Sequence, residues 1–219
     1  MEWKDEGYLL FKKNFSENSI KIDVLTLEHG KYTGIVYGGS SRKSKKIFQI
    51  GNKILLNWKS KSENKSGYLN VELINPVTPL FFDDKKKSIC ILSGASLLKI
   101  LLPENQINKK IFLSFENLIS NFNADNWISL YIFWELSLIK DLGYDINFLD
   151  NSYSKNNKIN LNGKTFNIPK FLFTKNKIND EKDIIEALTF NKNLFLENII
   201  IPNRLKVPIS RNLLENYFK

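Results

Sequence analysis

The first part of the chain alternates apolar and polar positions with a period of two. Ile20, Ile22 and Val24, for example, are separated by Lys21 and Asp23. Such alternation is typical of strands with one buried face. The pattern predicts five strands, near residues 8–11, 20–24, 32–37, 47–58 and 67–74. Five short strands without an intervening long helix indicate a small closed barrel.

After Pro76 and Pro79 the apolar positions follow the helical period of about 3.6. We expect helices over residues 107–122 and from residue 127 to Gly143, then a helix capped by Asp180 that reaches about residue 190. Further helical stretches are expected at about 193–200 and after Pro208. The predicted fold class is α+β: an N-terminal five-stranded OB-fold barrel over residues 1–76, followed by an α-helical domain over residues 77–219.

Two turns carry strong local signals. Gly30 follows a polar stretch between predicted strands and suits a positive φ. Residues 159–166 alternate around Asn162-Gly163, a pair typical of tight β-hairpins, so we expect a small β-hairpin insertion in the helical domain. Gly163-Lys164-Thr165 resembles the end of a phosphate-binding loop, but Lys158 stands where that loop requires glycine.

The residues needed for catalysis or metal binding are scarce. A zinc site needs about four ligands, whereas the chain has one histidine, His29, and one cysteine, Cys90. We expect His29 to be a solvated turn residue and Cys90 to be a buried apolar residue without a disulfide partner. The acidic pairs at residues 83–84 and 180–183 favour helix capping over a metal-dependent nuclease. We therefore expect no catalytic residues, no cofactor and no metal.

The distribution of charge is more informative than its total. Of the 32 basic residues 29 are lysine, and a lysine-rich codon bias accounts for part of the net charge of +9. Residues 81–150 nevertheless carry 7 basic and 9 acidic residues, while residues 31–65 carry nine basic residues and one acid, Glu63. This concentration predicts a surface for nucleic acid.

Residues 41–46 place four cations in six positions beside serine hydroxyls. Cations and hydroxyls of this kind bind phosphate, although a solvated loop would show the same local pattern. The predicted DNA-binding residues are Arg42, Lys43, Lys45, Lys46, Lys59, Lys61, Lys31 and Ser41. Aromatic residues interleaved with them could stack on bases or fill the barrel: Tyr32, Tyr37, Phe48, Trp58 and Tyr68.

Several blocks occur in an order and spacing that resemble the RecO family of recombination mediators. They are residues 3–10, 25–30, 38–42 and 127–136, the last running into Leu142-Gly143-Tyr144. The resemblance covers roughly residues 1–150. It implies an OB-fold, binding of single- and double-stranded DNA, and strand annealing. It also implies work with RecR, and possibly RecF, to load RecA onto DNA coated by single-strand-binding protein.

One feature departs from that family pattern. Many members carry a four-cysteine zinc module after the central helix, but residues 148–169 contain no cysteine and hold the predicted hairpin. The resemblance also implies a dock for the C-terminal tail of single-strand-binding protein. We expect that dock in the apolar segment 81–150, with Lys99, Lys109 or Lys110 at its rim.

Two other functions remain open on the residues alone: a generic RNA-binding OB-fold module, and a nuclease that uses the acidic pairs. The charged N-terminus is unlike a signal peptide, and no apolar run reaches the roughly 18 residues that span a bilayer. We therefore expect a cytoplasmic, nucleoid-associated protein without a membrane partner.

Overall fold

The computed structural model describes residues 1–42, 44–60, 67–144, 158–170, 172 and 180–219. The chain divides into two compact units, Met1–Leu113 and Ser114–Lys219, and each is described by itself.

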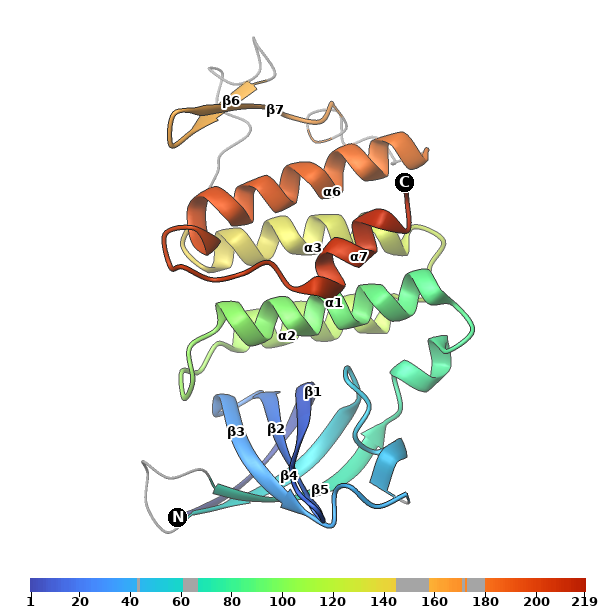
Figure 1. Cartoon of the computed structure of the whole chain (residues 1–219), viewed down its shortest axis with the longest axis vertical. Coiled ribbons are helices and arrows are strands. Elements are labelled where there is room, and N and C mark those ends of the chain that lie inside the picture. Colours follow the sequence, from blue (N-terminus) through green and yellow to red (C-terminus); the bar gives the residue numbers. More distant parts are fainter. Residues whose placement is uncertain (43, 61–66, 145–157, 171, 173–179) are drawn as a thin grey trace. The chain divides into compact units, whose positions relative to one another are not determined.

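The first unit contains a closed barrel of five strands in the order β1-β2-β3-β5-β4 (Figure 1). The strands are β1 Glu2–Ser16, β2 Ser19–Thr26, β3 Gly30–Tyr37, β4 Lys53–Lys59 and β5 Gly67–Asn75. The first half of β1 pairs with β4 and its second half with β2, while the parallel pairing of β3 with β5 closes the barrel. This arrangement confirms the predicted five-stranded barrel.

The alternating pattern explains the inner face of the barrel. Side chains two positions apart lie on the same side of a strand, so one set from each strand meets inside. Ile22, Val24 and Ile54 are completely buried there. The core is completed by Leu9, Ile20, Val36, Phe48, Leu56, Trp58 and Leu69.

The start of the fourth strand differs from the prediction. We expected it at Ile47, but β4 begins at Lys53. Residues Ser44–Lys46 form a 3₁₀ turn, and Gly51 has a φ of +92° that no extended strand adopts. The Asn52 side chain donates to the backbone oxygens of residues 46 and 47, at 3.1 Å each, and holds this irregular segment in place.

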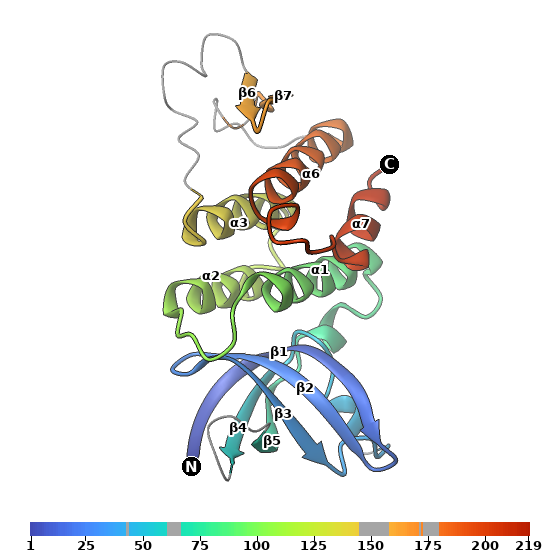
Figure 2. The same ribbon diagram turned by 60° about the vertical axis from the view of Figure 1, so that its left-hand side comes forward.

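Two helices belong wholly or partly to the first unit. α1, Lys85–Leu101, begins at Asp84, whose side chain accepts a hydrogen bond from the Lys87 backbone nitrogen at 3.0 Å. It packs against β1 and buries Cys90 completely, as predicted (Figure 2). α2, Lys109–Ser120, begins two residues later than we expected because Asn108 caps it, and Ile107 is consequently exposed.

The second unit is helical, with the predicted hairpin. Its helices are α3 Trp127–Asp141, α6 Glu181–Phe195 and α7 Ile209–Asn216, and its hairpin strands are β6 Lys158–Leu161 and β7 Lys164–Asn167. Gly143 has the expected positive φ, and Asp180 caps α6 as expected. The stretch expected at about 193–200 is not a separate helix, because α6 continues directly into a π-helical turn, Leu196–Ile200.

A buried ion pair joins the helices of the second unit. Arg211 on α7 donates to both carboxylate oxygens of Glu135 on α3, at 2.5 and 3.0 Å, and both side chains are at most 1% exposed. Tyr131 and Asn191 also donate to this carboxylate. Burial by itself would lower the pKa of Arg211, but the charge and hydrogen bonds of Glu135, together with Tyr131 and Glu215, outweigh burial and raise it.

Candidate nucleic-acid interface

Residues 38–52 join β3 to β4 and carry the predicted phosphate-binding cations; we call this segment the basic loop. Hydrogen bonds fold it back onto the end of β3. The Ser44 hydroxyl donates to the Gly38 carbonyl at 3.1 Å and lies 2.8 Å from the Ser41 hydroxyl. Phe48, 3% exposed, inserts into the barrel core and anchors the loop.

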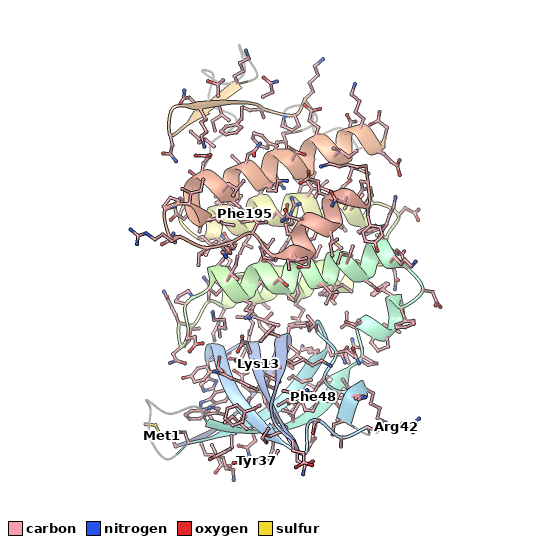
Figure 3. The ribbon with its side chains drawn as sticks, in the orientation of Figure 1. Met1, Lys13, Tyr37, Arg42, Phe48 and Phe195 are labelled. Carbon is pink, nitrogen blue, oxygen red and sulfur yellow. The ribbon has the colours of Figure 1, made fainter. Side chains whose placement is uncertain are left out.

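Three cations of the basic loop are exposed: Arg42, Lys45 and Lys46. Within the described parts of the chain, none of the three pairs with a carboxylate. Burial lowers the pKa of nearby Lys12, and the charge of Lys45 lowers it further. Figure 3 shows Arg42 projecting from the loop, away from Phe48. Such uncompensated cations are available to phosphate.

The remaining predicted DNA-binding residues lie in different surroundings. Lys43 and Lys61, together with Lys65, lie outside the described residues. Lys59 is exposed at the end of β4, but its ammonium lies 2.8 Å from the Glu2 carboxylate. The Ser41 hydroxyl lies 2.8 Å from the Ser44 hydroxyl and accepts a hydrogen bond from the Ser44 backbone nitrogen at 3.3 Å.

Lys31 differs from the exposed cations of the basic loop, because its side chain is buried. It is only 8% exposed, and its ammonium donates to the Lys99 carbonyl oxygen at 2.7 Å. Burial lowers the pKa of Lys31, while the carboxylates of Glu104 and Asp23 act in the opposite direction. A lysine held in this way completes the packing of α1 against the barrel.

The barrel sorts the five interleaved aromatic residues into two groups. Phe48 and Trp58 point into the core, and Tyr32 packs edge-on against Trp58 at 5.6 Å. Tyr37 and Tyr68 instead point outward and are 68% and 45% exposed. Their rings stack on each other, with centroids 5.1 Å apart and planes 22° apart.

The sequence analysis did not include two lysines on the outer surface of the barrel among the predicted DNA-binding residues. Lys13 on β1 and Lys21 on β2 are register partners, and Lys21 is in turn the partner of Ile35 on β3. Their signal is present in the sequence, since both occupy outward positions of alternating strands. It becomes readable only when the register of the neighbouring strands is known.

His29 is not the solvated turn residue that we expected. Its Nδ1 atom lies 2.8 Å from a carboxylate oxygen of Asp5, and its ring stacks on Trp3 with centroids 4.1 Å apart. Asp5 also accepts backbone hydrogen bonds from residues 6 and 28. His29 therefore has a structural role in the turn before β3.

Comparison with known proteins assigns both parts of the chain to the same family. Residues 1–77 match the family model for the N terminal of recombination protein O, and residues 83–165 match the model for its C terminal. The chain belongs to the RecO family. This membership confirms the resemblance seen in the sequence.

Individual relatives agree. The DNA repair protein RecO of Roseobacter denitrificans is 31% identical over 145 residues, which cover 66% of this chain and 60% of the relative. The RecO proteins of Wolbachia pipientis and Rickettsia peacockii are 33% and 36% identical, over 67% of this chain and 60% and 61% of their own lengths. The alignments thus span about three-fifths of the length of these curated relatives.

Polar contacts with Glu197 hold the β6–β7 hairpin in place. Asn162 and Gly163 have φ values of +52° and +81°, which confirms the predicted tight turn. The Lys164 ammonium lies 2.5 Å from the Glu197 carboxylate, and the Asn162 amide donates to the Glu197 carbonyl at 2.8 Å. No cluster of three or more potential metal ligands occurs among the residues described, and residues 148–157 lie outside them.

A groove of about 250 Å³ lies on the second unit between α2 and α3. It is lined by Ser114, Asn117, Leu118, Leu130, Phe133, Trp134 and Ser137. Phe133 is 42% exposed. Two of the three lysines that we expected at the rim of the dock contact residues that do not line this groove. Lys109 pairs with Glu28 at 2.5 Å, and the Lys99 ammonium lies 3.3 Å from the centre of the Phe11 ring.

No helix within the described ranges combines the length and apolar character needed to cross a membrane.

Proposed function

We propose that this chain is a DNA-binding recombination mediator without a catalytic step of its own. It binds single- and double-stranded DNA, anneals complementary strands, and works with RecR, and possibly RecF, to load RecA onto strands coated by single-strand-binding protein. Membership of the RecO family and relatives named as DNA repair proteins support the proposal. The single observation that carries it is the folded basic loop, whose described cations are exposed and pair with no carboxylate among the described residues.

The physical basis is release of counterions. Each phosphate that a cation neutralises frees condensed salt ions from the DNA, so affinity falls as salt rises. Arg42, Lys45 and Lys46 suit this role because, in the described part of the chain, no carboxylate competes for them. The anchoring of the loop by Phe48 lowers the entropy lost when the cations are ordered by DNA.

We expect the triple variant R42A/K45A/K46A to bind all DNA sequences more weakly and to show a shallower dependence of log affinity on log salt. The slope should fall by up to about 0.7–0.9 for each lost phosphate contact, and hence by up to about 2–3 units for three contacts. Fluorescence anisotropy with labelled DNA over a series of salt concentrations measures both effects.

A charge-matched control separates local contacts from net charge. Lys158, Lys182 and Lys206 are exposed in the second unit, and their replacement by alanine removes the same three charges. If this control flattens the slope as much as the loop variant does, the basic loop does not bind phosphate specifically. Competition between DNA and RNA of equal length tests the RNA-binding alternative. Tighter binding of RNA would support that alternative and contradict our proposal.

The groove on the second unit suits the tail of single-strand-binding protein. Such a tail is acidic with an apolar tip, and a groove between helices accepts a short apolar segment. Phe133 and Leu130 offer the apolar surface, while Ser114, Asn117 and Ser137 offer polar partners at the edge. We therefore propose this groove as the dock, in place of a site defined by the lysines named above.

We expect the Phe133→Ser variant to bind a fluorescent tail peptide roughly tenfold more weakly, equivalent to about 1.4 kcal/mol. Titration of the peptide into the full chain gives the affinity. Ile209→Ser is the matched control, because Ile209 is an exposed apolar residue of the same unit that does not line the groove. Equal losses in both variants would remove the groove from the proposal.

A further inference from the structure

Tyr37 and Tyr68 are held as an exposed pair by the geometry of the barrel. Tyr37 lies two positions after Ile35 on β3 and therefore on the same outward face, and Ile35 is the register partner of Tyr68 on β5. The two rings are diagonal neighbours across paired strands, a position from which aromatic side chains reach each other. Because both strands belong to the closed barrel, the stacked rings are pre-organised.

This pair stands out because the other aromatic candidates of the barrel are packed. Burial of a tyrosine ring away from water is favourable, yet Tyr37 remains 68% exposed and Tyr68 45% exposed. Hydrogen bonding to Tyr68 raises the pKa of Tyr37. A tyrosine phenol, with an ordinary pKa of about 10, is in any case neutral near pH 7 and does not repel phosphate. The exposed faces are therefore apolar and uncharged.

Lysines lie on the strands to either side of the pair, Lys21 on β2 and Lys59 on β4, and the exposed ammonium of Lys59 also pairs with Glu2. One cross-strand row runs from Lys13 through Lys21 and Ile35 to Tyr68 and Lys59. Register partners share the outer face of the sheet, so the row follows the curved outside of the closed barrel, with Lys21 and Lys59 on the two strands that flank β3 and β5.

The basic loop begins directly after Tyr37. Gly38 accepts the hydroxyl hydrogen bond of Ser44, which places the turn that contains Lys45 and Lys46 next to the end of β3. The Tyr37–Tyr68 pair therefore has Lys21 and Lys59 on the neighbouring strands, and the cations of the basic loop follow the end of β3. Figure 3 labels Tyr37, Lys13 and Arg42 on this barrel.

We infer that Tyr37 and Tyr68 form a stacking platform for unpaired DNA bases, while the flanking cations bind the phosphates of the same strand. The inference rests on the proposed DNA-binding function and deepens it, because it assigns the recognition of unpaired strands to two residues. Bases of a duplex are stacked on each other and present no free face to a tyrosine ring. The platform therefore contributes to binding of single strands and not of duplexes.

The test compares the Y37A/Y68A variant with the wild-type chain on three ligands of equal length: a single strand, a blunt duplex, and a single strand in which the bases are replaced by abasic sites. Stacking contributes about 1–3 kcal/mol per base, so the variant should bind the single strand roughly 5- to 150-fold more weakly. Its affinity for the duplex should stay within about twofold and its salt slope unchanged, since no phosphate contact is lost. The wild-type chain should bind the abasic strand as weakly as the variant binds the normal strand.

Two controls make the result specific. Y37F/Y68F keeps both rings and should retain affinity for the single strand, whereas Phe15→Ala removes another exposed aromatic side chain of the barrel and should change nothing. Equal losses for single strand and duplex, or tight binding of the abasic strand by the wild-type chain, would overturn the platform. Tighter binding of single-stranded RNA than of DNA would overturn its assignment to DNA. Failure of the wild-type chain to bind any DNA would instead contradict the proposed function itself.

Discussion

Replacement of Arg211 by methionine should lower the free energy of unfolding of the second unit by about 3–5 kcal/mol. The variant leaves the Glu135 carboxylate, which is 0% exposed, without its cation. It also removes the hydrogen bond from Arg211 to the Leu188 carbonyl oxygen at 2.7 Å, which joins α7 to α6. Removal of one partner of a buried pair is costly because the remaining charge is neither solvated nor paired.

Hydrogen exchange of peptides from α3 and α6, combined with denaturant unfolding, resolves this loss within the second unit. The double variant E135Q/R211M removes both charges and should recover part of the lost stability, because no unpaired buried charge remains. Lys109→Ala is the control for an exposed pair and should cost less than about 1 kcal/mol. A loss below about 1 kcal/mol in R211M would show that the buried pair is not what joins the helices.

Replacement of Gly30 by alanine should destabilise the first unit by about 2–5 kcal/mol, the sum of backbone strain and steric overlap. Gly30 has a φ of +79°, which side chains other than glycine rarely adopt. A Cβ atom at this position would also lie 2.0 Å from the backbone oxygen of Gln106, so backbone atoms must move. Denaturant unfolding and hydrogen exchange of β2 and β3 peptides measure the loss.

Gly38 provides a matched comparison. Its φ of +71° is similar, but a Cβ atom there would meet nothing within 4 Å. Gly38→Ala should therefore show only the strain of the left-handed backbone, about 1–2 kcal/mol. If the two variants were equally destabilised, the close approach of Gln106 would have no energetic role.

Local sequence patterns were sufficient wherever neighbours in the chain decide the structure. The period-two alternation predicted the barrel because it reports which face of each strand leaves water. Asp84, Asp180 and the Asn162-Gly163 turn were predictable for the same reason, since caps and tight turns depend on a few adjacent residues. The irregular segment before β4 was missed because Asn52 stabilises it with backbone hydrogen bonds that compete with strand pairing.

The sequence by itself therefore determined the barrel, the helical second part, the family and the position of the basic loop. Only the tertiary structure decided which cations and aromatic rings are available. Among the described residues, Arg42 pairs with no carboxylate. Lys31 is buried against α1, and Tyr37 meets Tyr68 because β3 pairs with β5. Glu135 and Arg211 likewise meet across 76 positions of chain. Availability and pairing depend on the register and packing of distant segments, and no periodicity within one segment contains that information.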